Sequence, residues 1–267
     1  RRDVVLGQMA NNEALGAARL NGTRLSSLRA AAVMKYVGFH VAADGLAIGN
    51  LTEPNHPKGG CLIIVGDDSW NETTQINSDS RFLAQHLHMP ILEPATFQEI
   101  KDWMDTGFEL SGKCNLYIAY IITTNQADGG GTVRVRKNRY PDININQKTE
   151  LSSSQISIKD FVMIPPHTSQ KEATRAGRYE KLLRLAREKN LNRLLYLNPK
   201  KETKHSLGFI TSGSSYNYLE HALFEMGLSG EFPILKLGMT HPLDSSAVNE
   251  LLSRVETAVV IEENGAH

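Results

Sequence analysis

The most constraining feature of this sequence is the repeated alternation of short apolar runs with amphipathic, helix-like segments. Four runs in the first half are continuous, rich in β-forming residues and bounded by glycine, proline or polar residues: 30–35, 59–68, 89–94 and 115–123. Runs of this kind are typical of buried strands. Because strands that alternate with helices form mostly parallel sheets covered on both faces, the pattern predicts an α/β fold.

The clearest helix candidate begins at Thr96. This residue is of a type that caps helix N-termini, and Glu99 follows it at the spacing of a capping box. Six residues then fall on one face at spacings of three and four: Phe97, Ile100, Met104, Gly107, Phe108 and Ser111. The segment is therefore predicted to be an amphipathic helix that covers the sheet.

The character of the chain changes between residues 125 and 159, which are polar and without period. We interpret this stretch as a linker or surface excursion. Alternation then resumes with apolar runs at 161–166, 193–199, 206–213, 233–239 and 257–263, and with helices over 172–189, from Ser214 and from Asp244. The sequence therefore predicts two three-layer α/β domains with mostly parallel sheets, at residues 1–124 and 160–267.

Composition narrows the class of protein. The 29 basic residues balance the 29 acidic ones, which argues against nucleic acid as the main partner. No stretch approaches the roughly 20 apolar residues of a membrane span, and the first residues lack a secretory signal core, so a cytoplasmic location is expected. The two cysteines, Cys61 and Cys114, lie in strand-like runs, which favours buried free thiols over a disulfide.

Polar and ionisable residues gather where predicted strands end, the place where ligands bind in open α/β sheets. Lys35, Tyr36 and His40 follow the first strand. The structural alternative is that Lys35 and Tyr36 close the strand in solvent while His40 makes one polar contact at a helix start. From the residues alone, the two interpretations are evenly balanced.

Two helix N-termini are further candidates. One helix begins near Asn12 and carries Glu13 in its first turn, followed by alanine and glycine residues that let another backbone or a flat ligand approach closely. The simpler interpretation is that Glu13 stabilises the positive end of this helix. The second candidate, residues 206–218, runs from a strand through a Gly/Ser turn into a helix, which is a weak signal for anion binding.

Six segments, taken in order, carry a family resemblance: NNEALGAARLNGTRLSSLRAAAVMKYVGFHVAAD, DDSWNETTQINSDSR, LEPATFQEIKDWMDTGFELS, LGFITSGSSYNY, LKLGMTHPL and VVIEE. Each segment alone is weak evidence for a family, but the six segments in this order are specific. They resemble the large (alpha) subunit of indolepyruvate ferredoxin oxidoreductase, a thiamine-diphosphate-dependent 2-oxoacid:ferredoxin oxidoreductase. The resemblance implies that residues 1–124 form a pyrimidine-binding domain that is incomplete at its N-terminus, and that residues 160–267 form a transketolase-C-like domain.

The resemblance also implies site residues. Glu13 becomes the catalytic acid that hydrogen-bonds N1′ of the cofactor's aminopyrimidine, where a carboxyl group favours the tautomer whose 4′-nitrogen takes the C2 proton of the thiazolium. Lys35, Tyr36 and His40 are then cofactor-binding residues. The residues implied to bind substrate are Thr73, Thr74 and Gln75.

The chain departs from the family pattern at several of these positions. Tyr36 stands where the family has His, His40 where it has Asn, and Thr73–Thr74 where it has Ser–Ser. Trp70 replaces a Pro–Gly corner. These departures leave open which 2-oxoacid is used.

The implied reaction is oxidative decarboxylation of an (aryl)pyruvate to an acyl-CoA with electrons passing to ferredoxin. It implies thiamine diphosphate, with magnesium held by a diphosphate-binding domain outside this chain, and iron–sulfur clusters on other segments or a partner. The implied partners are that domain or subunit, a smaller oxidoreductase subunit and ferredoxin, in an oligomer. The alternatives are a non-catalytic α/β assembly or ligand-binding module, and a non-redox thiamine-diphosphate decarboxylase.

A magnesium site within this chain is a tempting interpretation of residues 66–77, because Gly-Asp-x with a downstream Asn holds magnesium in the diphosphate-binding domain of thiamine enzymes. The segment from Gly66 to Asn77 is too short for that motif. We therefore assign no metal ligand, and expect Asp67 and Asp68 to close the strand and fix the loop that follows.

Overall fold

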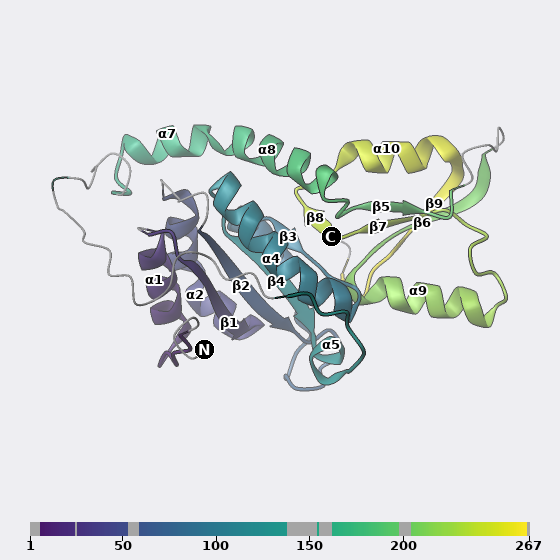
Figure 1. The fold of residues 1–267 in the computed structure, drawn as a ribbon, viewed down its shortest axis with the longest axis horizontal. Helices are drawn as coiled ribbons and strands as arrows, with labels where there is room; N and C mark the ends of the chain where they lie inside the picture. Colours follow the sequence, from purple (N-terminus) through teal and green to yellow (C-terminus); the bar gives the residue numbers. More distant parts are fainter. Residues whose placement is uncertain are drawn as a thin grey trace.

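The described part of the chain forms two β-sheets, each flanked by helices (Figure 1). The computed structural model describes residues 6–24, 26–52, 59–137, 154, 162–197 and 204–265. Within these ranges most neighbouring strands run parallel, which confirms the predicted α/β fold.

The first sheet has five strands in the order β1 (Arg29–Lys35), β2 (Gly60–Asp67), β4 (Ile118–Thr123), β3 (Ile91–Leu92) and β8 (Met239–His241). The first four are parallel, and β8 pairs antiparallel with β3. One face is covered by α1 (Glu13–Thr23), α2 (Tyr36–Leu51) and α3 (Ser80–His86). The other is covered by α4 (Phe97–Cys114) and α8 (Arg175–Glu188). Two short helices, α5 (Thr124–Asp128) and α7 (His167–Ala173), complete this part.

The second sheet has four strands in the order β5 (Arg193–Leu195), β7 (Ile234–Leu237), β6 (His205–Ser212) and β9 (Val255–Ile261). Only β5 is antiparallel to its neighbour. The two faces are covered by α9 (Gly213–Glu225) and α10 (Ser245–Arg254), so this sheet too has three layers.

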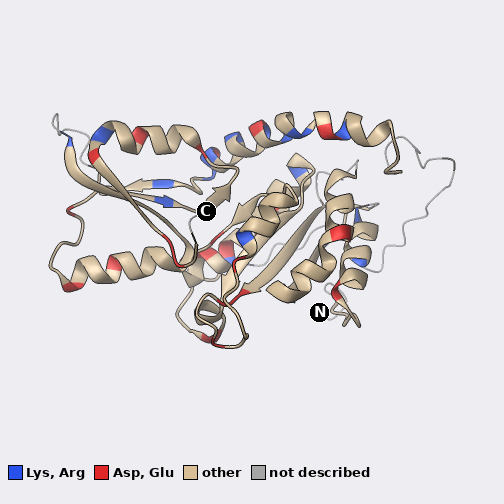
Figure 2. Ribbon diagram, turned by 180° about the vertical axis from the view of Figure 1, so that it is seen from behind, with Lys and Arg blue, Asp and Glu red and all other residues tan. Residues whose placement is uncertain are grey.

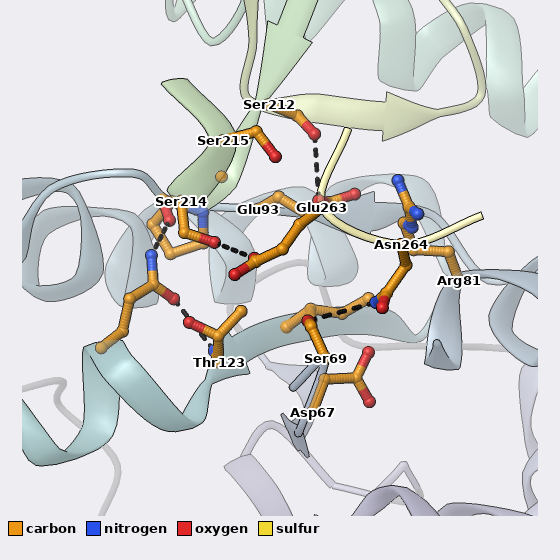
Figure 3. A pocket seen from close by; sticks show the side chains of 14 residues that line it. Asp67, Ser69, Arg81, Glu93, Thr123, Ser212, Ser214, Ser215, Glu263 and Asn264 are labelled. Atoms are coloured by element: carbon orange, nitrogen blue, oxygen red, sulfur yellow. Dashed lines mark hydrogen bonds between the residues drawn. The ribbon is translucent and has the colours of Figure 1, made fainter. Parts of the chain in front are cut away.

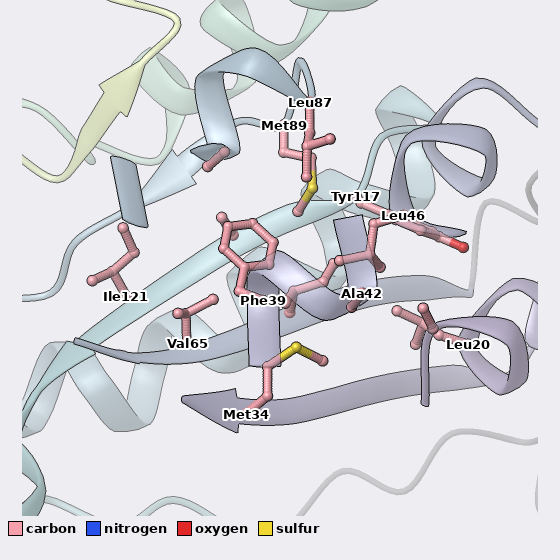
Figure 4. Close-up of a cluster of buried hydrophobic side chains, with 14 of the residues drawn as sticks. Leu20, Met34, Phe39, Ala42, Leu46, Val65, Leu87, Met89, Tyr117 and Ile121 are labelled. Carbon is pink, nitrogen blue, oxygen red and sulfur yellow. The ribbon is translucent and has the colours of Figure 1, made fainter. Parts of the chain in front are cut away.

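The core of the first sheet explains why its strands are continuously apolar. Phe39 and Leu46 of α2 and Leu20 of α1 pack onto one face, against strand residues that include Val65 and Ile121 (Figure 4). In β2, β3 and β4 the alternate residues pack against α4 and α8 on the other face. The run at 30–35 was expected to be a buried strand, but it forms the edge strand β1, and its alternate residues are exposed on that face, Val33 by 74%. A strand buried on both faces has no polar side to present, so its sequence reads as one apolar run.

Helix α4 begins as the sequence predicts. The Thr96 hydroxyl accepts a hydrogen bond from the Glu99 amide at 3.2 Å, and the Glu99 carboxylate accepts one from the Thr96 amide at 3.3 Å. This reciprocal pair is the predicted capping box. The helix ends at Asn115, whose φ of 56° is left-handed.

Three features of the second half differ from the expectation. No strand is present among the described residues of the run at 161–166, where Pro165 and Pro166 remove two backbone donors. The helix expected over 172–189 is two helices, α7 and α8, that meet at Thr174. The run at 233–239 is divided between β7 in the second sheet and β8 in the first.

Of the polar stretch 125–159, α5 and an irregular segment to residue 137 are described, together with residue 154, and the rest lies outside the described residues.

The crossing between β7 and β8 takes place at Gly238. A methyl group there would overlap the Trp103 ring of α4 and would lie 2.5 Å from the Leu191 carbonyl oxygen, so the position has no room for a side chain. Asn192 fixes the crossing, since its Oδ1 accepts hydrogen bonds from the Gly238 and Met239 amides, both at 3.0 Å. Because β8 and α8 follow residue 160 yet pack with the first sheet, the division of the chain into domains stays a prediction.

A buried ion pair also joins the two sheets. Lys236 of β7 is only 1% exposed, and its Nζ donates to both carboxylate oxygens of Glu99 on α4, at 2.7 and 2.9 Å. The same ammonium lies 4.3 Å from the centre of the Tyr216 ring. Arg193 of β5 also contacts the Glu99 carboxylate. The second sheet is therefore attached to α4 by charge as well as by packing.

Candidate functional site

The carboxyl ends of β1 and β2 lie side by side, with Lys35 in register with Gly66. Lys35 is exposed, and its Nζ lies 3.4 Å from both the carbonyl and the hydroxyl oxygen of Thr73. The structure thus brings together one residue from the predicted cofactor group and one from the predicted substrate group.

Asp68 builds the loop that carries Thr73 and Thr74. Its buried carboxylate accepts hydrogen bonds from the Glu72 amide at 2.8 Å, the Thr73 amide at 2.6 Å, and the hydroxyls of Thr73 and Thr74 at 3.1 and 3.0 Å. Burial favours the protonated acid, but these four donors outweigh it and lower the Asp68 pKa to about 2. The expected loop-fixing role of Asp68 is confirmed, whereas Gln75 is exposed on the same loop.

Asp67 joins the end of β2 to the start of α3. It is 3% exposed, and its carboxylate accepts hydrogen bonds from the Ser80 amide at 2.9 Å and from the Ser80 hydroxyl. Burial raises the Asp67 pKa to about 6, because the Ser80 donors compensate only part of the desolvation. The strand-closing role expected for Asp67 is therefore confirmed.

The raised Asp67 pKa predicts a pH-dependent effect of Asp67→Asn. Between pH 4 and 6 the folded protein holds a proton that the unfolded chain has released, so this carboxyl group makes the protein less stable as pH rises through that window. Asparagine has no such proton. Relative to wild type, the free energy of unfolding of Asp67→Asn should improve by about 3 kcal/mol between pH 4 and pH 8.

Urea denaturation at several pH values measures this difference. Asp68→Asn is the matched control, since the Asp68 pKa is lowered to about 2. Its loss of stability relative to wild type should grow between about pH 2 and 4 and stay constant from about pH 4 to 8. A constant difference between wild type and Asp67→Asn across the window would contradict the prediction.

Glu13 lies at the N-terminal ends of two helices. It is in the first turn of α1, whose N-cap Asn12 accepts a hydrogen bond from the Leu15 amide at 3.0 Å. Its side chain also lies against Gly38 in the first turn of α2, where a Cβ would be 2.5 Å from Glu13 Cγ and 2.7 Å from Oε1. Helix α2 has no acidic residue in that turn and no side-chain cap of its own, so both helix dipoles favour the carboxylate.

The Glu13 carboxylate is half-buried, and within the described ranges no side chain or amide hydrogen-bonds to it. Tyr36 and His40 lie on the same α2 segment, with ring centroids 6.3 Å apart and planes nearly perpendicular. Tyr36 is 8% exposed and belongs to the hydrophobic core, whereas His40 is exposed. In the described part of the chain, no hydrogen bond joins the Glu13 group to the Lys35–Thr73 group.

Gly38 is the site residue that the sequence did not single out. A glycine inside a helix is unfavourable by about 1 kcal/mol relative to alanine, so its presence three residues into α2 was an available signal. Only the packing of α1 against α2 shows that the missing side chain makes room for Glu13.

The Gly/Ser turn at 206–218 reaches a different place, the junction between the two sheets (Figure 3). There the N-terminus of α9 faces carboxylates of the chain itself: Glu93 accepts a hydrogen bond from the Ser212 hydroxyl at 3.1 Å, and Glu263 accepts one from Ser214. Glu93 also accepts from the Thr240 hydroxyl at 2.6 Å. Burial raises the Glu93 pKa, opposed by the charge of Arg81 and by both hydroxyl donors.

The residual cavity at this junction is small, about 30 Å³. Glu93 and Glu263 already occupy the N-terminus of α9, where the sequence suggested that an external anion could bind. In the structure these contacts join the two sheets instead. Trp70, one of the departures from the family pattern, also belongs to this junction, because its Nε1 donates to Glu263 at 2.8 Å.

Three findings concern other classes of site. No group of three or more His, Cys, Asp or Glu residues within the described ranges is arranged to hold a metal ion. None of the helices in those ranges is long and apolar enough to cross a membrane. Cys61 and Cys114 are buried free thiols, as expected.

No model of a known protein family matches the chain. It is 30% identical over 238 residues to "Indolepyruvate oxidoreductase subunit IorA" of Methanothermobacter marburgensis, a match that covers 89% of this chain and 36% of that protein. The IorA subunit of Archaeoglobus fulgidus is 28% identical over 242 residues, covering 91% of this chain and 36% of that protein. The chain therefore spans about a third of the length of these relatives.

The fold is also similar to a solved structure, the 2-oxoglutarate:ferredoxin oxidoreductase from Magnetococcus marinus. The TM-score is 0.63 at 14% sequence identity, and the match covers 94% of this chain and 49% of that one. At this identity the likeness concerns the fold alone. The resemblance found in the sequence is confirmed by six IorA sequences that are 27–30% identical over 89–91% of this chain, and the solved structure confirms the fold.

Proposed function

We propose that this chain supplies the pyrimidine-binding side of the cofactor site in a thiamine-diphosphate-dependent 2-oxoacid:ferredoxin oxidoreductase that acts on an arylpyruvate. The observation that carries the proposal is the Glu13 carboxylate. It lies at the N-terminal ends of α1 and α2, beside a glycine that leaves it room, and its oxygens have no hydrogen-bond donor from the described residues.

The residues present fit the cofactor. An acid that is half-buried, and to which none of the described residues donates a hydrogen bond, can hydrogen-bond the N1′ atom of an aminopyrimidine and hold a proton there. When bound, thiamine diphosphate supplies the nucleophilic carbon on which a 2-oxoacid is decarboxylated. In this proposal Glu13 positions the ring, while Lys35, Tyr36 and His40 line the same side of the site.

The loop fixed by Asp68 is the proposed substrate-binding element. The hydroxyl proton of Thr73 points toward Asp68, and that of Thr74 toward Asp68 or the Ile76 carbonyl, so both oxygens present lone pairs to a ligand. Lys35 reaches the same loop and offers a positive charge to the carboxylate of a 2-oxoacid. Gln75, exposed beside them, is the remaining polar contact of the proposal.

The other parts of the reaction belong to other segments or subunits. Magnesium and the diphosphate group would be held by a diphosphate-binding domain, and electrons would pass through iron–sulfur clusters to ferredoxin, with coenzyme A taking the acyl group. We further propose a smaller oxidoreductase subunit as partner, an oligomeric enzyme and a cytoplasmic location. Residues 1–124 would be the pyrimidine-binding domain and residues 160–267 the transketolase-C-like domain.

The complete complex tests the proposal through reduction of a viologen dye by arylpyruvates, with and without thiamine diphosphate. We expect cofactor-dependent reduction that also requires coenzyme A. Decarboxylation without dye reduction would support a non-redox thiamine decarboxylase instead. If neither thiamine diphosphate binding nor turnover is observed, the chain is a non-catalytic module and the proposal is wrong.

Gly38→Ala tests the position of Glu13 without changing its chemistry. The new methyl group would lie 2.5 Å from Glu13 Cγ, so the carboxylate must move while the helix itself gains a favourable residue. We expect cofactor-dependent activity to fall at least about tenfold. A displacement of a catalytic group by about 1 Å can lower the rate of a reaction about 100-fold. The melting temperature should stay within a few degrees of wild type.

The matched control is Gly177→Ala in α8, where a Cβ would meet nothing within 4 Å. It makes the same helix substitution far from Glu13 and is expected to leave activity unchanged. If Gly38→Ala and Gly177→Ala had equal activities, the space left by Gly38 would have no part in positioning Glu13.

A further inference from the structure

A second cavity, of about 280 Å³, lies at the opposite end of the first sheet from Glu13. It is lined by the last turn of α2, the end of α3, the end of α7 and the start of α8, with Leu116 just before the amino end of β4. Its apolar wall consists of Ala47, Leu51, Leu87 and Leu116. This volume is close to the lower limit of ordinary small-molecule sites.

Four basic side chains line the same cavity: His86 and His88 at the end of α3, and Arg175 and Arg178 at the start of α8. Only one acidic residue joins them, Glu172, which forms an ion pair with Arg175. Burial, followed by the charges of Arg175 and His86, lowers the pKa of His88. His88 is therefore a neutral hydrogen-bonding group, and the excess of positive charge next to the apolar wall comes from two arginines that face one carboxylate.

His88 adopts a backbone conformation that would be easier for glycine. It follows the C-cap of α3 with φ at 55°, and the His88 and Met89 amides donate to the carbonyls of Gln85 and Ala84 at 3.0 and 2.8 Å. This is the Schellman arrangement, in which glycine is usual because a side chain makes the left-handed conformation unfavourable by about 1 kcal/mol. The chain nevertheless places an imidazole here.

The surrounding structure holds this conformation. The His88 carbonyl accepts hydrogen bonds from Asn50 Nδ2 and from the Tyr179 hydroxyl, both at 2.9 Å. Arg178 adds rigidity to the wall, because it donates to the Thr174 hydroxyl at 2.7 Å and to the Asn115 carbonyl at 3.2 Å. The His88 side chain is therefore presented to the cavity by a fixed backbone.

We infer that this cavity binds a small organic anion with an apolar body and one carboxylate, at a site separate from the proposed cofactor site. The carboxylate would lie against His86, His88 and Arg175, and the apolar body against the leucine wall. Inorganic phosphate would match the charge but leave that wall unused. Because the two sites lie at opposite ends of the sheet, failure of one proposal leaves the other intact.

Calorimetric titration of the full-length protein with benzoate tests the inference. We expect a Kd on the order of 1 mM, as suits a ligand of this size, and binding about tenfold weaker for benzamide and for inorganic phosphate. His88→Gly should weaken benzoate binding about tenfold without lowering the melting temperature, because glycine suits the left-handed position. Arg175→Gln should weaken it by a similar factor, and Glu172→Gln should tighten it.

The matched control is His221→Ala, which removes an exposed histidine on α9, away from the cavity, and should leave benzoate binding unchanged. Absence of benzoate binding at about ten times the expected Kd overturns the inference. So does equal affinity for benzamide, which would show that charge has no part. Benzoate binding that is unchanged in both His88→Gly and Arg175→Gln would place the ligand elsewhere and overturns it as well.

Discussion

Glu13→Gln in the complete enzyme is expected to lower thiamine-diphosphate-dependent 2-oxoacid oxidation by a factor of about 10² to 10⁴, the usual contribution of a positioned acid or base. Glutamine retains the size of the side chain and one acceptor oxygen, but it cannot exchange a proton with N1′ of the aminopyrimidine. The fold should be little affected. Glu13 is half-exposed and, among the described residues, has no donor to lose, so only its interaction with two helix dipoles is removed, about 1 kcal/mol.

The assay for Glu13→Gln is dye reduction by the complete complex under saturating cofactor, together with a melting curve. Glu109→Gln is the matched control, since it makes the same substitution in α4 at a carboxylate paired with Lys113 and Lys189. We expect the control to keep full activity. A Glu13→Gln enzyme with an unchanged rate would rule out the proposed role of Glu13.

Much of the first sheet could be predicted from the sequence because its signals are local. Buried strands read as apolar runs, and the capping box at Thr96 depends on residues three positions apart. The same is true of the Asp68 carboxylate, whose hydrogen-bond donors lie within six residues of it in the chain. Where a structural feature depends only on near neighbours, the pattern of residues predicts it directly.

The features that could not be predicted depend on contacts between distant segments. The run at 233–239 looks like one strand, since an apolar strand has the same composition in either sheet. Only the close packing of Gly238 against Trp103 and Leu191 shows where the chain leaves one sheet for the other. The role of Glu93 at the sheet junction could not be predicted either, because its hydrogen-bond partners Ser212 and Thr240 are more than a hundred residues away in the chain.

The candidate site shows both situations at once. The sequence places Glu13 in the first turn of a helix, where a structural role on the helix dipole is sufficient to explain it. The tertiary contact with Gly38 adds that the carboxylate is held over a second helix end in a space made by a missing side chain. This contact is what separates a positioned acid from an ordinary helix-stabilising one.

Lys236→Ala is expected to lower the free energy of unfolding by about 3 kcal/mol, because removing one member of a buried ion pair leaves the other charge with fewer partners. Lys236 is 1% exposed and donates to both oxygens of Glu99, and burial lowers its pKa against the opposing effect of Glu99. The alanine variant also removes the contact with the Tyr216 ring of α9, on the second sheet itself. Urea denaturation measures the loss.

The double variant Glu99→Gln/Lys236→Met separates the charge from the packing. It removes both charges while methionine refills most of the space, so it should be clearly more stable than Lys236→Ala, as buried pairs replaced by apolar groups often are. The matched control is Lys113→Ala, which breaks the exposed pair with Glu109 and should change the free energy of unfolding by less than about 0.5 kcal/mol. If Lys236→Ala were no more damaging than Lys113→Ala, the buried pair would not be what attaches the second sheet to α4, and the apolar contacts between the two sheets would have to hold the junction.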